Sequence, residues 1–206
     1  MRLVLASASP ARLTTLRAAG FDPEVRVSGI DEDGVLAAAH ERGAAAGPAD
    51  DVLVLARAKA EAVATDLVAG TDAVVLGCDS LLELDGASHG KPADAAEATA
   101  RWRLMRGRSG VLHTGHWLVD LRTGRASGRT ASTVVHFANL SDAEIDAYVA
   151  TGEPLAVAGA FTIDGIGGPF VTGVEGDPHT VVGLSLPLLR DLLGDLGLTV
   201  PDLWSR

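Results

Sequence analysis

Two charged residues lie where the sequence pattern predicts apolar surroundings, and the first is Lys59. It follows Leu55 by four residues and precedes Val63 by four, in a segment with helical periodicity, so the three residues share one face of a helix. Lysines are rarely buried without a partner. Lys59 therefore either extends along the core to the protein surface or points into a cleft that holds an anion, and the pattern leaves both open.

Asp79 is the second such residue, with the opposite charge. It follows the apolar run at 73–76 and precedes Leu81 and Leu82, within a predicted buried strand. A carboxylate in that position must be paired, hydrogen-bonded or bound to a metal. The structural alternative is a turn or capping role, because Gly77 is typical of a β-bulge.

The start of the chain predicts a site for an anion. An apolar strand at 3–6 leads into a helix, for which Ser9 is a favoured N-cap and Pro10 suits the first turn. The free N–H groups and the positive dipole end of that helix would lie beside Ser7, Ser9 and Arg12. The simpler alternative is an ordinary capped helix after an edge strand.

Further charges are unremarkable singly but form a consistent set. Glu32 belongs to an acidic loop at 31–33, and Lys91 lies in the turn at 90–92. The complete set comprises the cations Arg12, Lys59 and Lys91, the carboxylates Glu32 and Asp79, and one helix N-terminus. Cleavage of a phosphoanhydride needs cations for the phosphate oxygens, carboxylates that hold Mg²⁺ or Mn²⁺, and a group that activates water.

The remaining chemical signals are weak. His113 and His116 are three residues apart, which on a strand puts their rings on opposite faces, so we interpret them as structural or surface residues. The chain has no GxxxxGK[ST] or strand-linked GxGxxG motif. The single cysteine, Cys78, has no basic partner in the sequence and is not predicted to be a nucleophile.

Strands and helices alternate along the chain, which predicts an α/β fold. We expect strands over 3–6, 24–27 and 73–84 (interrupted at 77–80), a hairpin turn at 85–86, and a long hairpin over 110–121 and 126–138. We expect helices from Pro10 to near Gly20, over 52–68 and 94–106, from the capping box at 141–144 to near Gly152, and over 184–196, with 34–51 a loop that carries a short helix. A strand is expected near Phe170.

Composition limits the classes of partner and compartment. The chain has 206 residues, 47% of them hydrophobic, and predicts one domain spanning 1–206. A net charge of −10 argues against nucleic-acid polymers but not against a small phosphorylated ligand. One cysteine, no signal-peptide pattern and no membrane-length apolar run predict a cytoplasmic protein without membrane attachment.

Seven short motifs occur in order along nearly the whole chain. They are LASASPAR (5–12), SGIDED (28–33), LARAKA (55–60), GCDS (77–80), GKP (90–92), LSDAEIDAYVATGEPLAVAGAFTIDG (140–165) and EGDPHTVVGLSLP (175–187). Together they resemble the Maf family of nucleotide pyrophosphatases, whose first motif is S-x-S-P-R-R. The resemblance implies an elongated α/β protein with a mixed, twisted sheet, flanking helices and a cleft between two lobes, often as a homodimer.

The resemblance also implies an activity and a set of site residues. The activity is metal-dependent hydrolysis of a nucleoside triphosphate to the monophosphate and pyrophosphate, which removes non-standard or surplus nucleotides. Glu32 and Asp79 would coordinate Mg²⁺ or Mn²⁺, with Asp79 also the base for the attacking water. Substrate contacts would come from six side chains, those of Ser7, Ser9, Arg12, Lys59, Lys91 and Asp164.

Two positions depart from the family pattern and bear on the choice of substrate. Ala11 stands where the motif has its first arginine, and Asp164 stands where many members have glutamine. A carboxylate cannot donate a hydrogen bond to phosphate, but it can bind a metal or a base amine. Two alternative functions remain: a non-catalytic nucleotide-binding regulator of septum formation and cell division, and a transferase acting on phosphorylated sugars or nucleotides.

Overall fold

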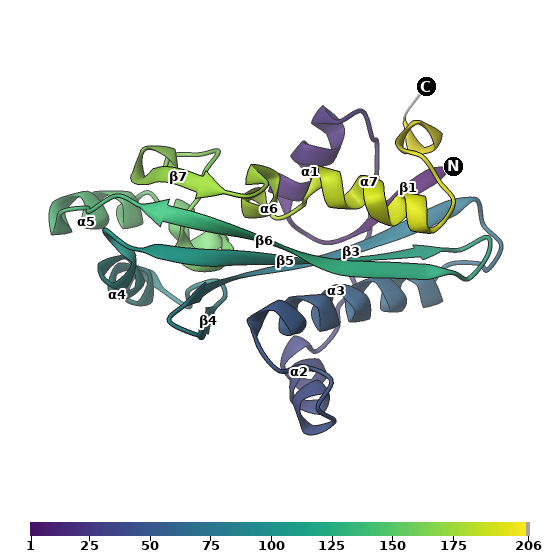
Figure 1. The fold of residues 1–206 in the computed structure, drawn as a ribbon, viewed down its shortest axis with the longest axis horizontal. Helices are drawn as coiled ribbons and strands as arrows, with labels where there is room; N and C mark the ends of the chain where they lie inside the picture. Colours follow the sequence, from purple (N-terminus) through teal and green to yellow (C-terminus); the bar gives the residue numbers. More distant parts are fainter. Residues whose placement is uncertain (205–206) are drawn as a thin grey trace.

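The computed structural model describes residues 1–204, and its main feature is a long mixed sheet (Figure 1). Seven strands of this region form the sheet, in the order β2-β1-β3-β5-β6-β7, with β4 paired to β3. The strands are β1 (Arg2–Ala6), β2 (Glu24–Val25), β3 (Ala73–Leu84), β4 (Ala87–His89), β5 (Ser109–Asp120), β6 (Ala126–Phe137) and β7 (Val171–Glu175). The parallel pairs β1–β2 and β1–β3 join antiparallel pairs, so the predicted mixed α/β architecture is confirmed.

Helices cover both faces of the sheet. They are α1 (Pro10–Ala18), α2 (Glu32–Glu41), α3 (Pro48–Thr65), α4 (Ala95–Met105), α5 (Asp142–Ala150), α6 (Pro178–Val182) and α7 (Leu186–Asp195). Short 3₁₀ turns lie at Glu153–Ala156, Ala158–Ala160, Gly168–Phe170 and Val200–Leu203. In the described residues, no helix is both long and apolar enough to cross a lipid bilayer.

Several local predictions are confirmed, although one helix starts earlier than expected. The Ser9 side chain caps α1, and Ser141 and Glu144 form the expected capping box of α5. The segment at 34–51, expected to be a loop that carries a short helix, contains most of α2, and α3 begins at Pro48, before its expected start at Val52. Its many alanines obscure a helical stripe, while the Asp31 carboxylate caps α2 through the Gly34 N–H.

The central strand β3 runs without interruption, so the expected break at 77–80 is wrong. Gly77 is required by close packing rather than by a bulge, because a Cβ there would lie 2.1 Å from the Ala56 carbonyl oxygen of α3. Gly115 on β5 meets the Val52 carbonyl oxygen at the same hypothetical distance of 2.1 Å. These two glycines let the backbone of α3 lie directly on the sheet, which fixes the side chains that α3 presents to β3.

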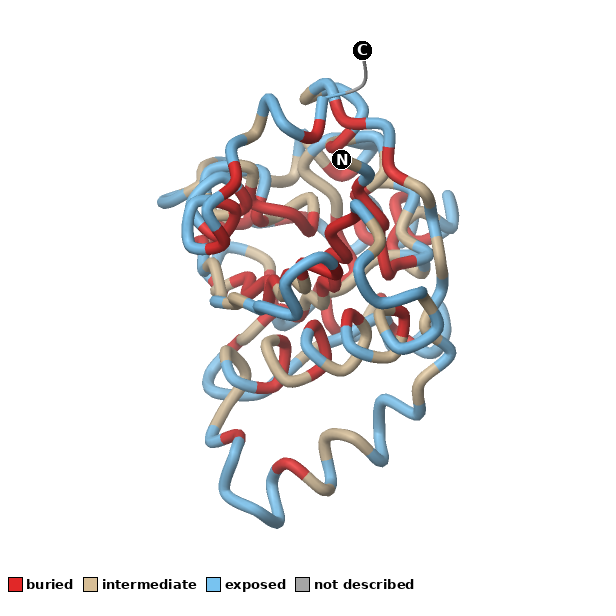
Figure 2. Tube along the Cα trace, turned by 90° about the vertical axis from the view of Figure 1, so that its right-hand side faces the viewer, coloured by how far each residue is buried: buried red, intermediate tan, exposed pale blue. Residues whose placement is uncertain are grey.

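The opposite face of the sheet is covered by α1 and α7. Leu76, Cys78 and Leu118 pack there against leucines of both helices in one buried cluster. Figure 2 shows the buried residues concentrated along the strands and on the inner sides of the helices, with the outer turns exposed. The apolar residues of β3 are therefore buried on both faces of the sheet.

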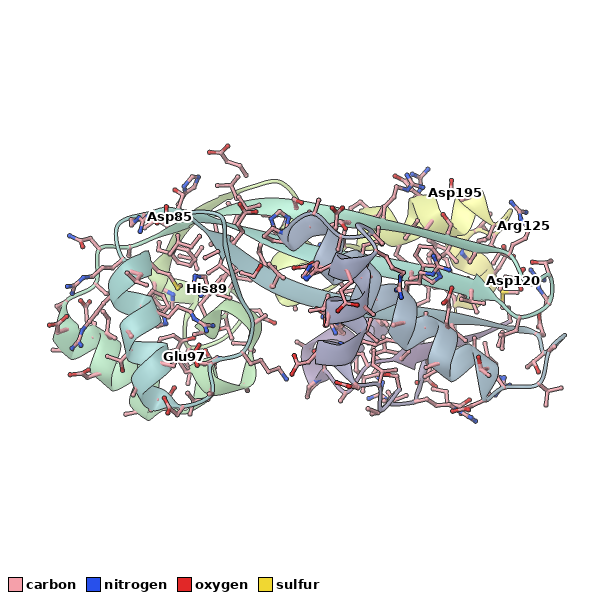
Figure 3. All side chains as sticks on the ribbon, turned by 90° about the horizontal axis from the view of Figure 1, so that it is seen from below. Asp85, His89, Glu97, Asp120, Arg125 and Asp195 are labelled. Carbon is pink, nitrogen blue, oxygen red and sulfur yellow. The ribbon has the colours of Figure 1, made fainter. Side chains whose placement is uncertain are left out.

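A second buried cluster supports the other half of the sheet. It surrounds Trp102 of α4, whose ring packs edge-on against Phe137, Tyr148 and Phe170. Seen from below, α2 and α3 lie under one half of the sheet, and α4 lies under the other, near the labelled His89 and Glu97 (Figure 3). The two halves of one continuous sheet are therefore supported by separate packing clusters.

A buried histidine should make the stability of this fold sensitive to mild acid. His116 Nε2 accepts the Ser185 N–H at 2.8 Å, and Nδ1 lies 3.0 Å from the Thr114 carbonyl oxygen, so the ring is neutral with its proton on Nδ1. Burial, together with the nearby Arg12 guanidinium, lowers the pKa of His116 from 6.5 to about 4. The unfolded chain then binds more protons between these values, so stability falls as the pH drops through that window.

We expect the free energy of unfolding to be about 2 kcal/mol smaller at pH 5 than at pH 7 because of this one group. Urea denaturation of the wild type and of His116→Gln at both pH values measures the effect. The His116→Gln protein should show a correspondingly weaker pH dependence, whereas the control His136→Gln, on the surface strand β6, should retain it. Equal pH dependence in wild type and His116→Gln would show that His116 does not carry the effect.

Candidate functional site

The middle of β3 has an unpaired edge, and the candidate site is built there. On the side away from β5, β1 pairs with the first part of β3, up to Gly77. On the same side, β4 pairs with Leu82–Leu84. Between these two pairings no described strand pairs with residues 78–81, so this edge of β3 is unpaired there.

Strand alternation places neighbouring side chains of the GCDS motif on opposite faces of the sheet. Asp79 lies on the face of Gly77, toward α3, and Ser80 lies on the face of α1 and α7. Asp79 accepts a hydrogen bond from Lys59 of α3, while the Ser80 hydroxyl accepts one from Arg12 of α1. Two adjacent residues of β3 therefore hold two cationic side chains, one on each side of the sheet.

Lys59 is held between two carboxylates. Its Nζ lies 2.6 Å from Asp79 Oδ1 and 2.8 Å from Glu32 Oε1, and its side chain is only 11% exposed. Lys59 is therefore paired within the protein, and its place in a cleft that holds an anion stays a prediction. Asp79 has no turn or capping role, since it lies within a regular strand, so that alternative is wrong.

Burial determines the acid–base character of Asp79. Desolvation raises the pKa of its carboxyl above the ordinary value, although the Lys59 ammonium and the Arg12 guanidinium act in the opposite direction. A carboxylate with a raised pKa is a better proton acceptor than an exposed one, which suits a general base. Lys59 and Arg12 favour the ionised carboxylate, which is the form that can accept a proton.

The same carboxylates provide the donors that a divalent cation needs. Glu32 Oε1 and Asp79 Oδ1 converge on one ammonium, and both are hard oxygen donors of the type that Mg²⁺ and Mn²⁺ prefer. Among the described residues, no group of three or more His, Cys, Asp or Glu side chains is arranged to hold a metal. The donor set fits a cation bound by two carboxylates and completed by substrate phosphates and water.

Arg12 fastens three elements together behind this edge. Its Nε donates to the Gly183 carbonyl oxygen at 2.7 Å, and its Nη1 donates to Ser7 Oγ and to the Cys78 carbonyl oxygen at 2.8 and 3.0 Å. Its Nη2 donates to Ser80 Oγ at 2.9 Å. Most N–H donors of the guanidinium are thus used within the protein. Arg12 therefore holds in place the segment predicted to bind an anion.

Replacing this arginine by lysine should destabilise the protein although the charge is kept. An ammonium cannot reproduce the fixed fork of donors, so buried acceptors on Cys78 and Gly183 would lose their partners. We expect Arg12→Lys to lower the free energy of unfolding by about 2 kcal/mol in urea denaturation. The control Arg17→Lys, at an exposed position of α1, should change little, and equal stability of the two variants would contradict this role for Arg12.

The start of α1 presents polar groups beside Arg12. Ser7 Oγ accepts both the Ser9 N–H and the Arg12 guanidinium, and Ser9 Oγ caps the Arg12 N–H at 3.4 Å. The predicted passage from strand to capped helix is therefore present, and anion binding there stays a prediction. Both hydroxyls are already hydrogen-bonded within the protein, and Ser9 is the more accessible of the two.

Lys91 is exposed, and no hydrogen bond or ion pair joins it to other described residues. Its turn is nevertheless fixed, because the Gly90 carbonyl oxygen accepts hydrogen bonds from the Arg101 side chain and from the Gly159 N–H. The backbone of Lys91 is thus held while its side chain is free to reach a ligand.

A loop at 162–167 carries Asp164 and is organised by Glu153, which the sequence reasoning did not single out. Glu153 accepts hydrogen bonds from the Tyr148 and Thr162 hydroxyls at 2.9 and 2.6 Å, and from the N–H groups of Ile166 and Gly167 at 2.9 Å each. Burial would raise the pKa of Glu153, but these hydrogen bonds outweigh it and hold the pKa below its ordinary value. The glycine-rich segment is therefore a fixed turn around one ionised carboxylate.

The two histidines of β5 lie on opposite faces of the sheet, as the strand assignment predicts. Both are buried, so the surface alternative is wrong and the structural one holds. His113 bridges Glu83 and Ser132, and His116 binds the backbone at the start of α7. Neither ring contacts the Lys59–Asp79 pair.

The chain is similar to known proteins over nearly its whole length. A family profile described as "Maf-like protein" matches residues 2–196. A protein of Salinispora tropica named "Nucleoside triphosphate pyrophosphatase" is 61% identical over 209 residues, covering 100% of this chain and 88% of that protein. Proteins of the same name from Streptomyces coelicolor and Mycobacterium marinum are 58% and 53% identical, each over 99% of this chain and over 95% and 97% of their own lengths.

Proposed function

The chain belongs to the Maf family, and from this premise we propose that it is a metal-dependent nucleoside triphosphate pyrophosphatase. The observation that carries the proposal is the Glu32–Lys59–Asp79 ion triplet at the unpaired edge of β3. The relatives' shared name supports the reaction class, since the match extends over the whole chain.

The proposed reaction breaks the bond between the α-phosphorus and the oxygen that bridges to the β-phosphorus. Asp79 accepts a proton from a water molecule, whose oxygen attacks the α-phosphorus, and pyrophosphate leaves. Lys59 and Lys91 balance negative charge on the phosphate oxygens, and the Ala11 N–H at the start of α1 orients them together with the Ser9 hydroxyl. A divalent cation held by Glu32 and Asp79 would supply further charge neutralisation.

The cellular role and assembly extend the same proposal. Removal of non-standard or surplus nucleotides is the expected role, in the cytoplasm, where nucleoside triphosphates are made. Glu32 being half-exposed leaves the ion triplet accessible to a small ligand. The homodimer that the family resemblance implies remains a prediction, which sedimentation of the purified protein tests.

Pyrophosphate release from a panel of canonical and modified nucleoside triphosphates tests the proposal. The panel is run with Mg²⁺, with Mn²⁺ and with a chelator, and with the wild type and Asp79→Asn. We expect metal-dependent release of pyrophosphate together with the monophosphate, strongly reduced in the variant. Nucleotide binding without turnover would favour the regulator, and a requirement for an acceptor other than water would favour the transferase.

A further inference from the structure

The turn that carries Lys91 is directed toward the unpaired edge of β3. β4 runs antiparallel to β3, and its last residue, His89, pairs with Leu82. The chain beyond His89 therefore leaves β4 in the direction of residues 78–81, which include Asp79. Lys91 lies two residues past His89, so the Cα atoms of these two residues are at most about 7.6 Å apart. This register places the start of the turn beside the edge on which Asp79 lies.

The Gly90 carbonyl oxygen is the point at which this turn is fastened. It accepts the Gly159 N–H at 3.0 Å and a second hydrogen bond from Nη1 of Arg101 on α4. A carbonyl oxygen has two lone pairs, and both are used here. Because a peptide unit is planar, these two bonds fix the orientation of the unit that joins Gly90 to Lys91.

Contacts on the other side of Lys91 complete the support of its backbone. Pro92 is buried, and a proline restricts the backbone of the residue before it. The Ala93 N–H donates to Glu97 Oε2 at 2.8 Å, while Glu97 Oε1 accepts a hydrogen bond from Arg101 Nη2. Arg101 thus holds the backbone before Lys91 directly and the backbone after it through Glu97.

Arg101 is too buried to contact a substrate itself. Its side chain is only 4% exposed, and within the described chain its side-chain hydrogen bonds end on Gly90 and Glu97. Burial and the Arg101 guanidinium both lower the pKa of His89, so the end of β4 also lies close to α4 (Figure 3). The guanidinium supports the turn, and the exposed Lys91 ammonium is the group that is free to reach a ligand.

The next residue of α4 fixes the segment that meets this turn. Trp102 Nε1 donates to the Ala160 carbonyl oxygen at 2.8 Å. Ala160 has a left-handed backbone with a φ of 62°, a conformation that costs free energy outside glycine and persists only where surrounding contacts fix it. Gly159, whose N–H binds the Gly90 carbonyl oxygen, precedes it. Two successive side chains of α4 therefore hold the two segments that meet at this oxygen.

We propose that Arg101 is a positioning residue for the hydrolysis, an inference that rests on the proposed function. Through the Gly90 carbonyl oxygen, Arg101 holds Lys91 where its ammonium meets the phosphate oxygens. A lysine on a loose turn would lose conformational freedom on binding, and a turn that is fixed in advance reduces that cost. Arginine suits this role because its planar fork reaches two acceptors at once, here on Gly90 and Glu97.

A double variant, Arg101→Met with Lys91→Ala, tests whether Arg101 acts through Lys91. We expect Arg101→Met alone to lower kcat/KM for the preferred nucleotide by about tenfold, because a displaced ammonium makes weaker contacts with the reacting phosphates. The same substitution in a Lys91→Ala protein should lower kcat/KM no further, since the group that Arg101 positions is already absent. The control Arg103→Met, at an exposed position of the same helix, should match the wild type.

A conservative variant and a surface variant separate positioning from folding. Arg101→Lys keeps one donor for the Gly90 carbonyl oxygen, so it should recover part of the activity that Arg101→Met loses. Glu97 is exposed, so Glu97→Ala leaves the core intact and provides the same test if Arg101→Met does not fold. We expect Glu97→Ala to lower kcat/KM by about threefold, and again only in a protein that retains Lys91.

These outcomes separate the inference from the proposed function. A loss confined to proteins that retain Lys91, with partial recovery in Arg101→Lys, supports positioning by Arg101. Wild-type kcat/KM in both Arg101→Met and Glu97→Ala, or equal losses with and without Lys91, rejects this role and leaves the reaction in place. Wild-type kcat/KM in Lys91→Ala also rejects it. An absence of pyrophosphate release by the wild type from every nucleotide rejects both the inference and the proposed function.

Discussion

Asp79→Asn should lower kcat for nucleoside triphosphate hydrolysis by about 10²-fold or more, since an amide cannot accept the proton of the attacking water. The variant keeps the size of the side chain and its place on β3, beside Lys59. Steady-state kinetics with the preferred nucleotide measures the loss. The control Asp66→Asn should match the wild type, and kcat within a factor of two of wild type in Asp79→Asn would remove Asp79 from the mechanism.

The raised pKa of Asp79 also predicts how Asp79→Asn affects the stability of the protein. Because burial raises the pKa of Asp79 in the folded protein above its unfolded value, the folded chain holds its proton to higher pH. The stability that this group contributes is lost as the pH rises through the raised pKa. Asp79→Asn should therefore have a Tm at pH 7.5 that is no lower than that of wild type, so a loss of activity cannot be ascribed to unfolding.

Lys59→Met should destabilise the protein and weaken triphosphate binding together. Methionine keeps the apolar part of the side chain but removes the ammonium between Asp79 and Glu32, which leaves a buried carboxylate without its cation. Breaking a buried ion pair by removal of one partner costs about 3–5 kcal/mol. Partial exposure of Glu32 and protonation of Asp79 reduce that figure, so we expect the lower end of the range in urea denaturation.

A double-mutant cycle measures the interaction free energy between Lys59 and Asp79. If Lys59 stabilises the fold through Asp79, Lys59→Met combined with Asp79→Asn should recover part of the stability lost in Lys59→Met alone. KM should remain high in the double variant, because the phosphate contact of Lys59 is still absent. Additive losses in stability, with KM unchanged in Lys59→Met, would show that Lys59 merely extends to the protein surface.

The sequence predicts much of this fold because its strongest signals are local. The Ser9 cap, the hairpin turn at Asp85 and Gly86, and the capping box at Ser141 each depend on a few neighbouring residues, and each is present in the structure. Prediction failed where a distant element decides the outcome. Gly77 is typical of a bulge in isolation, whereas contact with the α3 backbone explains it as part of a regular strand.

The candidate site shows the same division between local and distant determinants. Burial expectations for Lys59 and Asp79 were sufficient to predict that each needs a polar partner, but only the fold shows that they pair with each other. Glu153 gave no signal, because an exposed-type residue after a helix-ending glycine has no distinctive pattern. Its four hydrogen bonds come from residues on both sides of it in the sequence, and they form only after the loop closes around it.

The position of nucleophilic attack is the most direct test of the central claim, and a reaction in ¹⁸O-labelled water measures it. The preferred nucleotide is hydrolysed to completion, and the label in both products is read by mass spectrometry. Attack by water at the α-phosphorus predicts one labelled oxygen in the monophosphate and none in pyrophosphate. Label in pyrophosphate, or in inorganic phosphate released from the chain end, would contradict the proposed reaction.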